Sequence, residues 1–150
     1  MNILEIDHVL KTHPSTRNVF KRVYARNRLP IRLDVPSSLV GNTDTGDRPG
    51  THWVALCIDA NSRGEYYDLT GRPPFVRAYI NFMNKHCRSW TYNTIRVQEE
   101  DSTVCENHCI FYLIHRCGGK SIGDITRTLR HPREATDIVK TFVHRLINKA

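Results

Sequence analysis

Alternation of hydrophobic and polar residues predicts a β-hairpin near the middle of the chain. Residues 52–59 (HWVALCID) are rich in strand-forming side chains, NSRG predicts a tight turn, and residues 65–70 (EYYDLT) provide a strand that pairs back. Residues 37–42 and 90–97 have the composition of two further strands. We therefore expect a sheet built from the central part of the chain.

Apolar residues recur at helical spacing on both sides of this region. Residues 3–11 show the spacing clearly, and Thr16 is expected to cap a second helix over residues 18–29, which ends before Pro30. Helices outnumber strands and the strands are clustered, which predicts an α+β fold. The remaining predicted helices cover residues 75–86, 104–117 (ended by Gly118 and Gly119), 122–129 and 133–148.

Length and charge narrow the class of protein. The 150 residues suit one domain with its own hydrophobic core, and we find no repeat or linker, so residues 1–150 are expected to form a single domain. The formal net charge is +7, and residues 120–150 alone carry seven basic and three acidic side chains. This excess favours phosphate-rich or acidic partners such as DNA, although a solvated basic surface explains it equally well.

The N-terminal residues contain no long apolar core, so no secretory signal is expected. No stretch approaches the roughly 18 to 20 apolar residues of a membrane span, so no membrane partner is expected either. Five cysteines are an odd number. Without a secretory signal they predict a reduced, intracellular chain.

A histidine and an aspartate occupy the two outer ends of the predicted hairpin. His52 opens the first strand, and Asp68 closes the second. Because a tight hairpin brings its outer ends together, the two side chains are expected to lie side by side. A carboxylate in that position orients an imidazole and stabilises its protonated form.

A cysteine begins the predicted helix that follows the polar run VQEEDST. Cys105 is expected in the first helical turn, where the helix dipole and free amides favour a thiolate. Gln98 lies seven residues earlier, and its amide together with the Cys105 backbone N–H can form an oxyanion hole. Each residue alone has an ordinary explanation. The joint order of histidine, acid, glutamine and cysteine indicates nucleophilic catalysis.

A zinc site is an alternative interpretation of the same helix, because five cysteines and histidines crowd into thirteen residues. Structural zinc sites usually draw ligand pairs from a knuckle and a separate element, and the chain has no Cys-x2-Cys. We therefore expect no metal, and we expect Cys109 and Cys117 to be core residues.

The segments GTHWVALCID, YYDLTGRPP and VQEEDSTVCENHCIFYLIHRC closely resemble adenain, the adenovirus-type maturation cysteine protease. The similarity is greatest to relatives from adenovirus-like and Maverick/Polinton-type genomes, and it covers about residues 39–119. The resemblance implies that His52 is the general base, Asp68 the orienting acid, Gln98 the oxyanion donor and Cys105 the nucleophile. It also implies a papain-like, SUMO-protease-like α+β fold, with a central mixed sheet and the nucleophile helix packed against it.

The resemblance further implies a viral setting. Viral members cleave capsid and core precursor proteins at glycine-containing sites, so the host nucleus and the virion are the expected locations, and a monomer is expected. No cofactor is required chemically, but a short basic viral peptide and DNA stimulate such enzymes. In some members a cysteine eleven residues before the glutamine forms a disulfide with that peptide. Cys87 occupies this position, and a half-buried structural cysteine is the other explanation for it.

One position departs from the family pattern. Family members usually have glycine directly after the nucleophile, whereas this chain has Glu106. A carboxylate there raises the cysteine pKa and crowds the substrate unless it points away from the groove. Two alternative functions therefore remain: a weakened or non-catalytic DNA-binding relative, and a protease for ubiquitin-like modifiers with the same fold.

Overall fold

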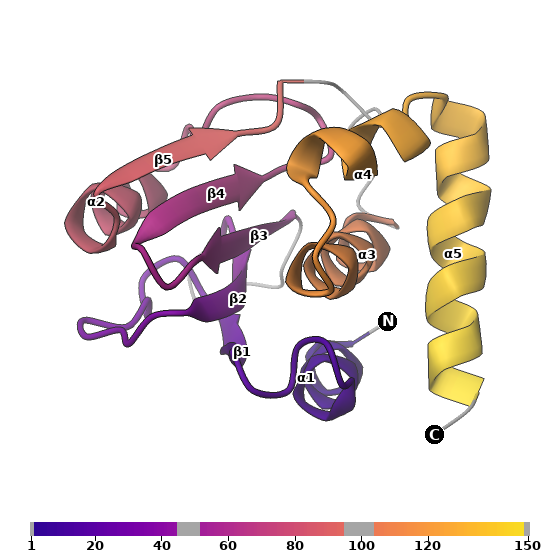
Figure 1. Ribbon diagram of the computed structural model, residues 1–150, viewed down its shortest axis with the longest axis horizontal. Helices are drawn as coiled ribbons and strands as arrows, with labels where there is room; N and C mark the ends of the chain where they lie inside the picture. The colour runs from indigo at the N-terminus through magenta and orange to yellow at the C-terminus, as the bar shows by residue number, and fades with distance from the viewer. Residues whose placement is uncertain (1, 45–51, 95–103, 149–150) are drawn as a thin grey trace.

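A computed structural model of the protein describes residues 2–44, 52–94 and 104–148. One five-stranded sheet lies between helix α2 on one face and helices α1 and α3 on the other, with α5 packed against α3 (Figure 1). The elements are α1 (Ile3–Thr12), β1 (Phe20–Tyr24), β2 (Ser37–Asn42), β3 (Trp53–Ile58), β4 (Arg63–Tyr67), α2 (Arg77–His86), β5 (Ser89–Tyr92), α3 (Cys105–Cys117), α4 (Ile122–Thr128) and α5 (Pro132–Asn148).

The sheet is mixed, and its strands lie side by side in chain order. The β2–β3 and β3–β4 pairs are antiparallel, whereas the outer pairs β1–β2 and β4–β5 are parallel. The predicted hairpin is therefore the centre of the sheet. Its register pairs Ala55 with Tyr67 and Ile58 with Gly64.

Side chains of the sheet alternate between two hydrophobic cores. Ala55 and Tyr67 face α3, whereas Leu56 and Tyr66 face α2. Helix α3 contacts the sheet, α1, α4 and α5, so apolar residues occur on most of its surface. It ends at Cys117 with Gly118 as the C-cap, and Gly119 follows with a φ of 107°, a conformation that favours glycine.

The predicted helix after Thr16 is wrong, because the structure has strand β1 within that segment. The Thr16 hydroxyl, which was expected to cap a helix, donates instead to the Leu10 carbonyl at 2.6 Å. The sequence FKRVY contains aromatic and β-branched side chains that suit a strand. Pairing with β2 and burial of Phe20 therefore outweigh the local helical pattern.

The other predicted elements form with ends shifted by a few residues. The strand predicted over residues 90–97 corresponds to β5, and its last three positions lie outside the described residues. Among the residues that the structure describes, no helix is long and apolar enough to cross a membrane.

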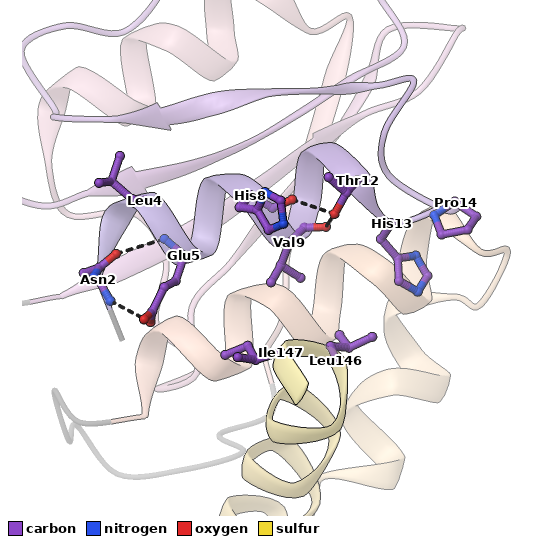
Figure 2. A pocket seen from close by; sticks show the side chains of 10 residues that line it. All are labelled: Asn2, Leu4, Glu5, His8, Val9, Thr12, His13, Pro14, Leu146 and Ile147. Atoms are coloured by element: carbon purple, nitrogen blue, oxygen red, sulfur yellow. Dashed lines mark hydrogen bonds between the residues drawn. The ribbon is translucent and has the colours of Figure 1, made fainter. Parts of the chain in front are cut away.

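A groove of about 500 Å³ lies between α1 and the end of α5 (Figure 2). Leu4 and Val9 of α1 line it opposite Leu146 and Ile147 of α5. Of the predicted catalytic residues that the structure describes, His52, Asp68 and Cys105, none belongs to this lining.

Candidate active site

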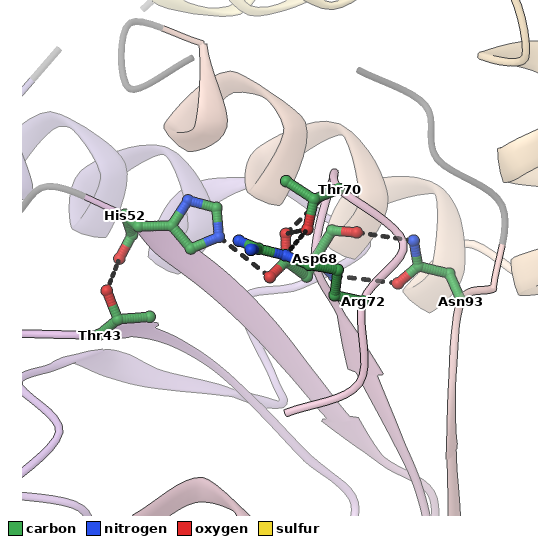
Figure 3. A network of polar contacts seen from close by, with 6 residues as sticks. All are labelled: Thr43, His52, Asp68, Thr70, Arg72 and Asn93. Atoms are coloured by element: carbon green, nitrogen blue, oxygen red, sulfur yellow. Dashed lines mark hydrogen bonds and ion pairs between the residues drawn. The ribbon is translucent and has the colours of Figure 1, made fainter. Parts of the chain in front are cut away.

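His52 and Asp68 meet at one end of the central hairpin. His52 directly precedes β3 and Asp68 directly follows β4, so the antiparallel pairing brings them together. His52 Nε2 and Asp68 Oδ2 are 3.0 Å apart, and both side chains are buried (Figure 3). The expected juxtaposition of the two side chains is therefore confirmed.

Asp68 is fixed from two sides (Figure 3). The Thr70 backbone N–H and hydroxyl donate to Asp68 Oδ1 at 2.9 and 2.8 Å, which leaves Oδ2 for His52. Asn93, just beyond β5, accepts from the Asp68 N–H at 3.0 Å and donates to the Asp68 carbonyl at 2.7 Å. The position of the carboxylate is thus set by an Asx-type turn and by the neighbouring strand.

These contacts determine the charge of Asp68 and the orientation of His52. Burial by itself opposes ionisation, but His52 and the two bonds from Thr70 outweigh it and lower the pKa of Asp68 below its ordinary value. Asp68 is therefore a carboxylate at neutral pH. Nε2 is the ring nitrogen that lies 3.0 Å from Asp68, so a neutral His52 with its proton on Nε2 has its free lone pair on Nδ1.

Cys105 is the first residue of α3, and this helix packs against β3. The thiol is fully buried and takes part in a hydrogen bond with the backbone of Trp53, the residue after His52. Val104, at the N-cap, provides no side-chain hydrogen bond to the first turn. The nucleophile candidate therefore lies against the strand that carries the candidate base.

The electrostatic setting of Cys105 differs from the sequence expectation. Burial raises the pKa of the thiol to about 12, and the Glu106 carboxylate adds to this rise. The thiol donates to Glu106 Oε2 across 3.8 Å, so the Glu106 side chain turns toward the sulfur. The expected thiolate at the helix N-terminus is thus not favoured in this conformation, because burial and the Glu106 carboxylate outweigh the backbone hydrogen bonds of Trp53 and Glu106 that lower the pKa.

Two other predicted residues have different outcomes. Gln98 lies outside the described residues, so its proposed oxyanion role stays a prediction. Cys87 is the C-cap residue that follows α2 and is half-buried, and a side chain at Gly64 would collide with its sulfur. Burial, with a smaller effect from Asp59, raises the pKa of Cys87 to about 11. Cys87 is therefore a packed residue, and its disulfide to an activating peptide stays a prediction.

Sequence analysis missed the polar residues behind the pair. Thr70 had a local signal, since Asp-x-Thr is an Asx-turn pattern. Asn93 had no such signal, because it is 25 residues from Asp68 in the sequence and reaches it only through the pairing of β4 with β5. Within the described ranges, no three His, Cys, Asp or Glu side chains are grouped as metal ligands.

His108 is a buried histidine one turn after Cys105. Its Nδ1 lies 3.5 Å from the Tyr67 hydroxyl, and the Tyr67 ring stacks on Tyr112 with centroids 4.5 Å apart. Burial lowers the pKa of His108 to about 4. The imidazole is therefore neutral at neutral pH and belongs to the core.

This burial predicts an acid-sensitive fold. The unfolded chain binds a proton at His108 below pH 6.5, but the folded chain binds it only below about pH 4, so acid favours unfolding in this window. We expect proton binding at His108 in the unfolded chain to lower the free energy of unfolding by about 3 kcal/mol as the pH falls from 6.5 to 4. Urea unfolding at several pH values measures this loss. His108→Gln should flatten the profile, whereas the exposed control His131→Gln should not; equal slopes in both variants would contradict the assignment.

The fold is the predicted α+β cysteine-protease fold, a mixed sheet with the Cys105 helix packed on it. The ASFV pS273R protease has a similar structure, with a TM-score of 0.64 and 18% identity over 92% of this chain. This chain spans 65% of the length of that protease. The central domain of the uncharacterized Lpg1148 protein from Legionella pneumophila aligns with a TM-score of 0.58 and 12% identity, covering 99% of this chain and 98% of that domain.

No protein-family model matches the sequence, and no curated protein matches it. At the identities found for the solved structures, the likeness establishes the fold and not the activity. Membership of the adenain family in particular stays a prediction from the motifs around His52, Asp68 and Cys105.

Proposed function

We propose that the chain is a cysteine endopeptidase with Cys105 as nucleophile, His52 as general base and Asp68 as the residue that orients it. The observation that carries the proposal is the buried His52–Asp68 pair at 3.0 Å on the strand that contacts Cys105. The protease fold supports it independently. Helix α3 and the β3–β4 hairpin thus supply the three groups from two rigid elements.

The proposed reaction follows from the chemistry of these groups. His52 Nδ1 takes the proton from the Cys105 thiol, and the thiolate attacks the carbonyl carbon of a peptide bond. The Cys105 backbone N–H and the Gln98 amide stabilise the resulting oxyanion. His52 then protonates the leaving amine, and a water molecule activated by His52 hydrolyses the thioester. Asp68 stabilises the imidazolium that forms in both halves of the reaction.

We propose viral precursor proteins, cleaved at glycine-containing sites, as the substrates. The resemblance to adenain supports this substrate class, and the likeness to a protease of viral origin is consistent with it. Glycine adjacent to the cleaved bond suits a nucleophile as enclosed as Cys105, because a substrate backbone without a side chain can approach most closely. A monomer acting in the host nucleus and the virion is proposed on the same basis.

The test is cleavage of a peptide library that contains single and paired glycines, read by mass spectrometry. We expect the wild-type chain to cut at glycine-containing sites and the Cys105→Ala variant to cut nowhere. Cleavage confined to fusions with folded ubiquitin-like proteins would instead support the modifier-protease alternative.

A second candidate function rests on Glu106. Its carboxylate lies 3.8 Å from the Cys105 sulfur and disfavours the thiolate. This feature would be expected in a catalytically weakened relative of the protease that acts mainly by binding DNA. Slow cleavage that increases when Glu106 is replaced would distinguish a weakened enzyme from a chain without activity.

We further propose that DNA binds the basic surface formed by α4 and α5. The arginines and lysine that carry the charge are exposed, and they lie on the side of the sheet opposite α2. They are Arg127, Arg130, Arg133, Lys140 and Arg145.

Salt dependence tests this surface. DNA affinity should fall steeply as salt rises, with a log–log slope of about −0.9 for each phosphate contacted. Arg130→Ala combined with Arg133→Ala should make the slope shallower by about 2. Arg77→Ala on α2 is the control and should leave the slope unchanged. Binding that does not respond to salt, or equal effects of all these substitutions, would contradict the proposed surface.

A further inference from the structure

A pair of thiols lies at the end of α3 farthest from Cys105. Cys117 is the last residue of α3, and Cys57 lies in β3. Their side chains share a hydrogen bond, and both residues are half-buried free cysteines. In a disulfide the two sulfur atoms would be about 2.05 Å apart.

The approach of these two elements is fixed by contacts that do not involve sulfur. Glu65 pairs with Cys57 in the β3–β4 register, so both side chains face α3. Glu65 accepts from the Tyr112 hydroxyl at 2.5 Å and from Arg116 Nε at 2.9 Å. These two bonds join the last turns of α3 to β4, the strand that pairs with β3 next to Cys57.

The two thiols have complementary reactivities. The hydrogen bond with Cys57 lowers the pKa of Cys117 against the effect of partial burial, and Arg116 assists. The same contact raises the pKa of Cys57, as does burial. Cys117 is therefore the more acidic thiol of the two and the first to react as a thiolate, with Cys57 beside it. By contrast, Cys109 is fully enclosed in the core.

We propose that Cys57 and Cys117 are a redox modification site that forms a reversible disulfide with hydrogen peroxide as the oxidant. The Cys117 thiolate attacks one peroxide oxygen, the O–O bond breaks, and hydroxide leaves, which gives a sulfenic acid. Cys57 sulfur then attacks the Cys117 sulfur, the S–O bond breaks, and the thiol proton leaves with the hydroxyl as water. Two electrons from the sulfur atoms reduce one peroxide, and a dithiol reductant reverses the reaction.

The disulfide would join the two elements that carry the candidate active site. His52 directly precedes β3, and Cys105 begins α3. Cys105 is twelve residues from Cys117, about 18 Å along the helix, so the bond would not touch the nucleophile. Oxidation should therefore stabilise the packing of α3 on the sheet while leaving Cys105 reduced. This inference does not depend on the proposed protease activity.

The experiment is peroxide titration of the reduced full-length chain, followed by alkylation, trypsin digestion without reduction, and mass spectrometry. Trypsin does not cleave before proline, so it leaves Cys57 in residues 33–63 and Cys117 in residues 117–120, and neither peptide holds another cysteine. We expect a Cys57–Cys117 cross-linked peptide as the main product, with dithiothreitol restoring both free thiols. The melting temperature should rise by about 5–10 °C on oxidation and return on reduction.

Variants make the assignment specific. Cys57→Ser and Cys117→Ser should each abolish the cross-link and the rise in melting temperature, whereas Cys87→Ser is the control and should keep both. The cross-link and the rise in melting temperature are also measured in the wild-type chain, so they test the proposal even if a variant fails to fold. Oxidation of Cys117 to sulfinic acid without a cross-link, a main cross-link between other cysteines, or an unchanged melting temperature in the cross-linked chain would each overturn the proposal.

Discussion

Replacing Cys105 with alanine is expected to lower peptide-bond cleavage by about four orders of magnitude or more, because no other group can form the thioester. The substitution removes a single buried sulfur atom, so the fold should persist, which circular dichroism would verify. Cys105→Ser keeps the size of the side chain and should be similarly inactive, since a serine beside Glu106 is a far weaker nucleophile than a thiolate.

Cys109→Ser is the matched control for this prediction. Cys109 lies one turn further along α3, is equally enclosed, and has a pKa raised by burial. Its loss should leave cleavage within a few-fold of wild type in folded protein. Cleavage that persists in Cys105→Ala and disappears in Cys109→Ser would move the nucleophile to Cys109.

Replacing Glu106 with glutamine is expected to speed alkylation of Cys105 at pH 7.5 by about tenfold. The substitution removes the negative charge that raises the pKa of Cys105 from its ordinary value, while it keeps the size of the side chain. A drop of one pH unit in the pKa gives about ten times more thiolate at neutral pH. Because burial is the larger cause, the pKa should remain above that of a free cysteine.

The measurement is the pH dependence of the iodoacetamide reaction, resolved for each cysteine by mass spectrometry. Glu106→Gly removes both charge and bulk, and it restores the residue that the family usually has, so cleavage should increase most in this variant. Glu134→Gln makes the same charge change on the exposed surface of α5 and should have no effect. An unchanged or slower reaction of Cys105 in Glu106→Gln would show that Glu106 does not control the thiol.

The parts of the site that sequence reasoning predicted correctly depend on local structure. The juxtaposition of His52 with Asp68 follows from a short hairpin whose turn and strand residues are visible in the sequence. The start of α3 at Cys105 follows from a polar run that meets an apolar helix. In both cases, residues close in the chain determine the geometry.

The parts that were missed depend on contacts between distant segments. Asn93 reaches Asp68 only because β4 and β5 pair in parallel. Strand β1 forms because β2 offers a partner edge, although the spacing of apolar residues over 18–29 suited a helix. The raised pKa of Cys105 likewise depends on burial beneath neighbouring elements, which the N-terminal position in a helix does not reveal.

Covalent labelling with a glycyl-glycine vinyl ester, an electrophile that captures an activated thiolate, tests the His52–Asp68–Cys105 assignment most directly. The labelled residue is identified by fragmentation mass spectrometry in the wild-type chain and in His52→Ala. We predict a label on Cys105 that forms at least about ten times more slowly in His52→Ala, as loss of a general base requires. No label on Cys105, or equal labelling of Cys105 in the two proteins, would contradict the assignment.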